Sequence, residues 1–218
     1  MPWPMVHFSI ALRVWEEELT PEFLLGSLAP DAIHMREGTN RQDKGRTHLC
    51  LDDGTMPDLA VIHRFCEERL RSRDPFFRQF ALGYAAHIWT DLRWTQTVWQ
   101  SFVEQAGQQR IEPFGDLKSI YNREVCQLDY DLLRMEKRAD AMLASVARSR
   151  AYSLPPLLKE QEIASYGDRV VRDLRDASME PRITPAYITM DTIQEFMERT
   201  SEELRELMKE WAQMTRLT

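Results

Sequence analysis

Histidine and aspartate side chains gather in the N-terminal part of this chain, up to Asp91. All five histidines lie there, and two aspartates accompany them in the runs APDAIH and HIWTD. Imidazole nitrogen and carboxylate oxygen are preferred ligands of zinc and of neighbouring divalent metals. These residue types therefore predict a metal site in this part of the chain. The candidate ligands are His7, Asp31, His34, His48, His87 and Asp91.

His87 and Asp91 stand four residues apart in the run GYAAHIWTDLRW, residues 83–94. Apolar positions recur around them at spacings of three and four, which predicts a helix with both residues on its buried face. An unpaired buried carboxylate costs on the order of several kcal/mol or more in lost hydration. A bound cation would neutralise Asp91, and a His–Asp hydrogen bond inside the core is the alternative. The positions that share this face are Phe80, Tyr84, Trp94 and Val98.

Over residues 1–95 the chain resembles the bacterial zinc-dependent phospholipase C family. The runs that carry the resemblance are MVHFSIA (5–11), PEFLLGSLAPDAIH (21–34), RTHL (46–49) and FALGYAAHIWTDLRW (80–94). That family is all-α and is related in fold to fungal single-strand-specific zinc nucleases. It binds a cluster of zinc ions through His and Asp side chains and hydrolyses phosphate esters. The resemblance implies the same fold, cofactor and class of reaction here.

Residue by residue, the resemblance implies that Asp31, His48, His87 and Asp91 surround one metal. It also implies that Asp91 bridges to a second metal, which His7 binds. Zinc is the expected metal, and manganese and iron are the other candidates. The secreted phospholipases have a further histidine-rich group downstream, including a His-x-x-x-Glu pair, whereas no histidine follows His87 in this chain. They also use the main chain of an N-terminal tryptophan, but Met1 and Pro2 precede Trp3 here, so we expect one or two ions rather than three.

Three other groups of polar residues have a functional and a structural interpretation. His34, three residues after Asp31, is a candidate ligand or a partner of a ligand, against an ordinary surface or capping role. His63 fits helix packing better than ligation. The carboxylates of a later helix could close the metal site, against a simple polar helix face. These carboxylates are Glu124, Asp129 and Asp131.

A basic stretch, MREGTNRQDKGRTH, lies between two of the candidate ligands. Arginine binds phosphate through two parallel hydrogen bonds, so Arg36 and Arg46 are candidate substrate-binding residues. The alternative is a solvated loop, because Glu37 and Asp43 offset half of its charge.

These patterns lead to two main hypotheses of function. The first is a phosphodiesterase-like or phospholipase C-like hydrolase of a small phosphate ester, in which Asp31 orients or deprotonates an attacking water activated by metal. The second is a non-catalytic helical domain in which the ion is structural, because four ligands already complete a closed site. A nucleotide phosphohydrolase built on a His-Asp dipeptide is the weakest alternative, since the chain contains no such dipeptide.

The elements that position these residues are predicted to be helical throughout, because apolar residues recur with the helical period and strand-like alternation is missing. We expect a single all-α, bundle-like domain spanning residues 1–218, with about six helices. Residues 1–150 would hold the metal-site helices, and residues 151–218 would cover them. The expected helices span about 5–18, 57–72, 75–106, 115–148, 158–177 and 189–216, with a polar loop at 30–50 and non-helical segments at 26–49, 153–157 and 177–188.

Composition narrows the class of protein. The 43% hydrophobic and 29% charged residues are ordinary for a soluble globular domain. No apolar run approaches the roughly 20 residues of a membrane span, and the N-terminus does not read as a signal peptide. Three widely spaced cysteines favour reduced thiols, so we expect a cytoplasmic protein. A net charge of −7 argues against general nucleic-acid binding, and the sequence leaves the oligomeric state open.

Overall fold

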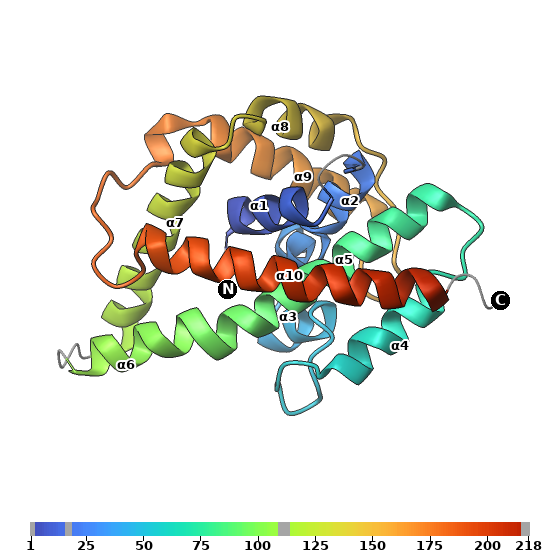
Figure 1. Ribbon diagram of the computed structural model, residues 1–218, viewed down its shortest axis with the longest axis horizontal. Helices are drawn as coiled ribbons and strands as arrows, with labels where there is room; N and C mark the ends of the chain where they lie inside the picture. Colours follow the sequence, from blue (N-terminus) through green and yellow to red (C-terminus); the bar gives the residue numbers. More distant parts are fainter. Residues whose placement is uncertain (1–2, 16–18, 109–113, 215–218) are drawn as a thin grey trace.

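The computed structural model describes residues 3–15, 19–108 and 114–214, and these residues form ten α-helices and no strand (Figure 1). The predicted all-α class is therefore confirmed. Two short 3₁₀ segments and one π-helical segment, labelled η, lie between the α-helices. The elements are α1 (Pro4–Val14), α2 (Pro21–Gly26), η1 (Ala29–Met35), α3 (Arg41–Thr47), α4 (Leu59–Arg69), α5 (Pro75–Trp94), η2 (Thr95–Trp99), α6 (Gln100–Gln108), α7 (Phe114–Met135), α8 (Ala139–Arg148), α9 (Glu160–Arg175), η3 (Ala177–Met179) and α10 (Met190–Met214).

The prediction of about six helices was too low: α2 and α3 were not predicted, and two predicted helices are divided into α5 and α6 and into α7 and α8. The stretch 26–49 is not the predicted loop. It contains η1, which holds Asp31, and α3, which His48 directly follows. α3 begins with a reciprocal capping box: the Asn40 side chain accepts from the N–H of Asp43 at 3.1 Å, and the Asp43 carboxylate accepts from the N–H of Asn40 at 3.0 Å. Such a cap satisfies backbone donors that a short helix leaves unpaired, so a polar segment can be helical without an apolar stripe.

Three other predicted boundaries differ from the structure. The predicted helix 115–148 is divided into α7 and α8 by a turn at residues 136–138. The predicted helix 75–106 is interrupted by the π-helical segment η2. The predicted first helix ends at Val14, and residues 16–18 lie outside the described part of the chain.

Helix α5 lies at the centre of the packing and positions the metal-site residues. α2 packs directly against it, and α1, α4 and α10 also contact it. α2 and α5 approach closely because each contributes a glycine at the contact, Gly26 and Gly83. A Cβ on Gly83 would lie 2.1 Å from the carbonyl oxygen of Phe23.

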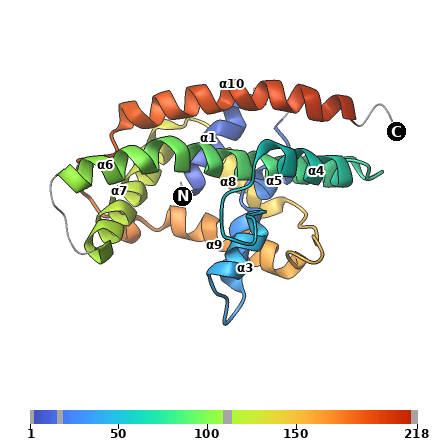
Figure 2. The same cartoon turned by 90° about the horizontal axis from the view of Figure 1, so that it is seen from below.

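Helix α10 forms an outer layer on one side of the molecule, and α3 projects on the opposite side (Figure 2). α10 contacts α1, α4 and α5, and its Phe196 ring forms a T-shaped contact with Trp94, with ring centroids 5.1 Å apart. α9 packs against η1 and α8. Among the described helices, none is both long enough and apolar enough to span a membrane.

Candidate metal centre

Five of the predicted metal ligands converge at one place in the helical core. α1 contributes His7, η1 contributes Asp31, the residue after α3 is His48, and α5 contributes His87 and Asp91. Ligand atoms of these residues form two groups, each compact enough to hold one ion, and His87 belongs to both. The histidines and Asp91 expose 2% or less of their side chains, whereas Asp31 exposes 15%.

Asp91 belongs to the group of His7 and His87, and its two oxygens face different nitrogens. Its Oδ2 is 3.2 Å from Nε2 of His87 and 3.3 Å from Nε2 of His48. Its Oδ1 is 3.6 Å from Nε2 of His7. A carboxylate with its oxygens directed to two sets of nitrogens has the arrangement of a bridging ligand.

Asp31 completes the group on the side of His48. Its Oδ1 is 3.5 Å from Nε2 of His48, and its Oδ2 is 4.0 Å from Nε2 of His87. The Nε2 atoms of the two histidines are only 3.4 Å apart. Donor atoms of Asp31, His48 and His87 therefore lie within 4.8 Å of one another, and Oδ2 of Asp91 lies beside both imidazoles.

The second ring nitrogens of His48 and His87 are held by backbone carbonyls. Nδ1 of His87 is 2.8 Å from the Ser27 carbonyl oxygen, and Nδ1 of His48 is 2.9 Å from the Lys44 carbonyl oxygen. Each Nδ1 must donate its proton to the carbonyl, which leaves Nε2 as the atom directed to the cluster. Metal-binding histidines in proteins are oriented in this way. The chain turns sharply after His48, where Leu49 adopts a φ of 55°.

Charges in the cluster are strongly perturbed. Burial raises the pKa of Asp91, but contacts with His87 and His48 lower it by more, so its pKa lies well below the usual range. Burial lowers the pKa of His48, but the Asp31 and Asp91 carboxylates raise it to a net value of about 9. For His7, burial and the neighbouring His87 lower the pKa to about 3. At pH 7 the cluster therefore has an ionised Asp91, a protonated His48 and a neutral His7.

Several buried polar atoms of the cluster have no hydrogen-bond partner within the described part of the chain, and this shows whether the residues fit a metal ion. Both ring nitrogens of His7 and both carboxylate oxygens of Asp91 are buried and have no hydrogen-bond partner among the described residues. Buried polar atoms in native proteins are almost always paired, and leaving one unpaired costs about 1–3 kcal/mol. Divalent cations beside Asp91 would bind one nitrogen of His7 and, one ion to each, the two oxygens of Asp91. The residues present therefore fit a metal ion.

The two predicted substrate-binding arginines lie in different environments: Arg36 is ion-paired, and Arg46 is exposed. The Arg36 guanidinium forms two hydrogen bonds to the Glu162 carboxylate, at 2.7 and 2.9 Å, and a third to the Leu157 carbonyl oxygen at 3.0 Å. It thereby ties the end of η1 to α9. Arg46 exposes 67% of its side chain and lies 3.7 Å from the Asp43 carboxylate. Neither guanidinium contacts a described residue of the cluster.

His34 and Lys44 lie beside Asp31 at the edge of the cluster. Nε2 of His34 is 3.6 Å from Oδ1 of Asp31, and His34 belongs to neither ligand group. The Lys44 ammonium is 2.8 Å from the same Oδ1. Arg36 and Arg46 were predicted as the substrate-binding residues of this stretch, and Lys44 was not. Lys44 stands four residues before His48, and this spacing places both residues on one face of α3 and its last turn. That spacing was the sequence signal that could have identified Lys44.

The carboxylates of α7 lie outside both ligand groups. Asp129 accepts a hydrogen bond from the N–H of Met5 at 2.9 Å and so holds the start of α1. Glu124 accepts hydrogen bonds from the N–H groups of residues 186–188. Asp131 pairs with an arginine of its own helix. Their contacts fix segments of the chain to one another.

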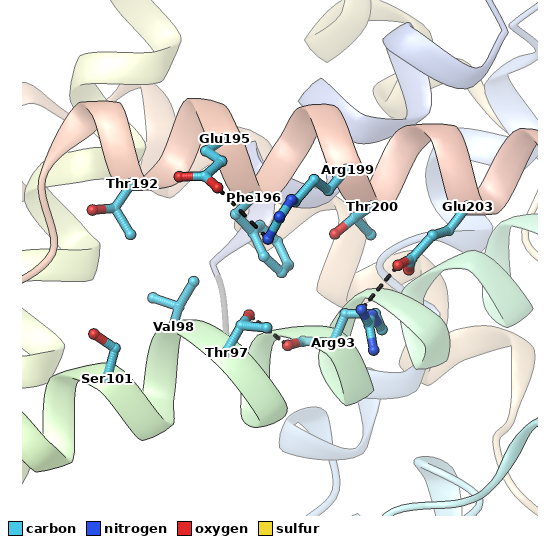
Figure 3. A pocket seen from close by; sticks show the side chains of 10 residues that line it. All are labelled: Arg93, Thr97, Val98, Ser101, Thr192, Glu195, Phe196, Arg199, Thr200 and Glu203. Carbon is cyan, nitrogen blue, oxygen red and sulfur yellow. Dashed lines mark hydrogen bonds and ion pairs between the residues drawn. The ribbon is translucent and has the colours of Figure 1, made fainter.

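A hollow of about 350 Å³ lies away from the cluster, where α10 faces α5, η2 and α6 (Figure 3). Its arginines are paired: Arg93 lies 2.9 Å from Glu203, and Arg199 lies 3.6 Å from Glu195. Phe196 forms part of its lining, and none of the clustered histidines or aspartates does.

Metal affinity is expected to increase with pH between 7 and 9. His48, with a pKa of about 9, holds a proton at pH 7 that must leave before Nε2 can bind a metal. One released proton makes the affinity rise roughly tenfold per pH unit and level off above the pKa. His7, whose pKa is about 3, has no such proton to release. Competition with a fluorescent chelator at several pH values measures this slope, and a pH-independent affinity would contradict the assigned charge of His48.

Comparisons of the chain with protein-family models, curated proteins and solved structures found no match. The case for a metal centre therefore depends on the residues themselves. Its strongest element is the convergence of three imidazoles and two carboxylates around buried atoms that lack partners.

Proposed function

We propose that this chain is a metal-dependent hydrolase of phosphate esters, with one or two zinc ions as its cofactor. Manganese and iron are the alternative metals. The observation that carries the proposal is the Asp91 carboxylate, which faces His7 with one oxygen and His48 and His87 with the other. The resemblance of residues 1–95 to zinc-dependent phospholipases C supports the same class of reaction.

The cluster supplies the groups that phosphate-ester hydrolysis needs. A bound divalent metal acidifies a water molecule and polarises a phosphoryl oxygen. Asp31 is the clustered side chain with the largest exposure, so a water that arrives from solvent meets its carboxylate first. Its pKa is lowered well below the usual range: burial raises it, and contacts with Lys44, His34 and His48 lower it by more. The ionised Asp31 therefore accepts a hydrogen bond from the attacking water and orients it, while the metal would lower the pKa of that water.

A structural ion is the second candidate function. Asp31, His48 and His87 form one group and Asp91 contacts both of its histidines, so these four side chains match the number of ligands of a tetrahedral site. The near-complete burial of the last three favours a closed site. Catalytic zinc keeps a position for water, whereas structural zinc does not. Turnover therefore separates the two functions.

Hydrolysis of a chromogenic phosphodiester by the metal-loaded protein tests the proposal. We expect cleavage of bis(4-nitrophenyl) phosphate, its loss on chelation, and its recovery with zinc or manganese. A monoester and phosphatidylcholine vesicles, assayed in parallel, distinguish the classes of phosphate ester. His63→Ala, which removes a histidine outside the cluster, serves as the control and should retain activity. Absence of turnover on every ester at full metal occupancy would reject the hydrolase and favour the structural ion.

A further inference from the structure

The cluster has one side that solvent reaches, and Lys44 lies there. Asp31 exposes 15% of its side chain and Lys44 exposes 33%. His34, on the other side of the same carboxylate, exposes 47%. The other clustered side chains are buried. A substrate from solvent therefore approaches the candidate ligands past Asp31, Lys44 and His34.

The Lys44 ammonium is placed to contact both the cluster and a substrate. Its Nζ is 2.8 Å from Oδ1 of Asp31 and 3.3 Å from Nε2 of His34. An ammonium has three N–H donors, so these two contacts leave one for a further acceptor. Meanwhile the backbone carbonyl of Lys44 holds Nδ1 of His48. The backbone of Lys44 thus orients the candidate metal ligand His48, and its side chain lies on the side of the cluster that solvent reaches.

The neighbouring arginines are less well placed for this role. Arg36 is held by two hydrogen bonds to Glu162. Arg46 points to solvent near Asp43 and exposes 67% of its side chain. Of these three basic side chains, Lys44 is the one that contacts the cluster directly.

We propose that Lys44 is a phosphate-binding residue of this site, whose ammonium contacts a non-bridging phosphoryl oxygen while it also contacts Asp31. The inference rests on the proposed function and names the residue that recognises its substrate class. Lysine binds phosphate as a compact point charge. A role confined to holding Asp31 in place is the competing explanation, and it predicts that loss of the ammonium disturbs the metal first.

Binding of inorganic phosphate to the zinc-loaded protein tests the inference without requiring turnover. Titration calorimetry would compare the wild type with Lys44→Met, Lys44→Arg and Lys209→Met, and elemental analysis would give the metal content of each. Lys209 is the control, because its ammonium also pairs with a carboxylate, Glu206 at 2.6 Å, but on the exposed face of α10. The methionine substitution keeps the backbone contact to His48, so circular dichroism should report a folded protein.

We expect Lys44→Met to weaken phosphate binding at least tenfold with unchanged metal content, Lys44→Arg to retain part of the binding, and Lys209→Met to match the wild type. Unchanged phosphate affinity in Lys44→Met, loss of metal together with phosphate, or no phosphate binding by the wild type would each overturn the inference. Failure of the proposed hydrolase appears separately, as phosphate binding without turnover. Phosphatidylcholine vesicles form a second arm: Lys44-dependent vesicle binding assigns a lipid headgroup, and its absence beside phosphate binding assigns a soluble ester.

Discussion

Replacing Asp91 with asparagine is expected to reduce the metal content of the purified protein to near zero and to abolish phosphodiester hydrolysis. One carboxylate serves both halves of the cluster, with Oδ1 facing His7 and Oδ2 facing His48 and His87. The amide has nearly the same size but lacks the charge that a divalent cation requires. We expect a loss of activity of roughly 10³-fold or more, because metal activation of the attacking water is lost.

Elemental analysis of protein purified without a metal-affinity tag measures this effect. Asp173→Asn, on exposed α9, is the matched control and should keep the metal content of the wild type. His7→Ala separates the two halves of the cluster: in a bridged site the content falls from two ions to one. Wild-type metal content in Asp91→Asn would exclude Asp91 as a ligand. A single ion unaffected by His7→Ala would favour a mononuclear, structural site.

The residues of the candidate site were predictable because their signals are local. His87 and Asp91 are separated by one helical turn on an apolar face, and each remaining ligand stands in a short recognisable run. Which basic residue is available to bind substrate could not be predicted from such local signals. Arg36 is bound by Glu162, which lies 126 positions later in the sequence. Its availability for substrate therefore depends on how α9 packs against η1, and no local pattern contains that information.

The contrast between clear and missing local signals also explains which helices were predicted correctly and which were not. Long helices with an apolar stripe, such as α9 and α10, were predicted to within a few residues. α3 was missed because its seven residues hold one buried side chain, Thr47, so the helical period is invisible there. Its capping box, Asn40 and Asp43, was the readable signal. The turn at residues 136–138 contains neither glycine nor proline, so the strongest markers of a helix end are missing.

Gly83→Ala is expected to destabilise the protein by about 3 kcal/mol or more, which in a domain of this size corresponds to roughly 6–12 °C in Tm. Alanine is normally the better residue in the interior of a helix, by about 1 kcal/mol. At this position its Cβ would lie 2.1 Å from the Phe23 carbonyl oxygen and 2.9 Å from the Ser27 nitrogen. Both atoms belong to the backbone, so no side-chain rotation relieves the contact and α2 must move away from α5.

That displacement also reaches the metal centre, because the Ser27 carbonyl holds Nδ1 of His87 at 2.8 Å. We therefore expect Gly83→Ala to weaken metal binding as well as to lower Tm, even though it touches no ligand. Thermal unfolding with and without zinc, compared with Gly107→Ala, measures both effects. Gly107 lies in α6 with nothing within 4 Å of its added Cβ, so alanine there should stabilise by about 0.5–1 kcal/mol. Equal behaviour of the two variants would mean that the close approach of α2 and α5 does not position His87.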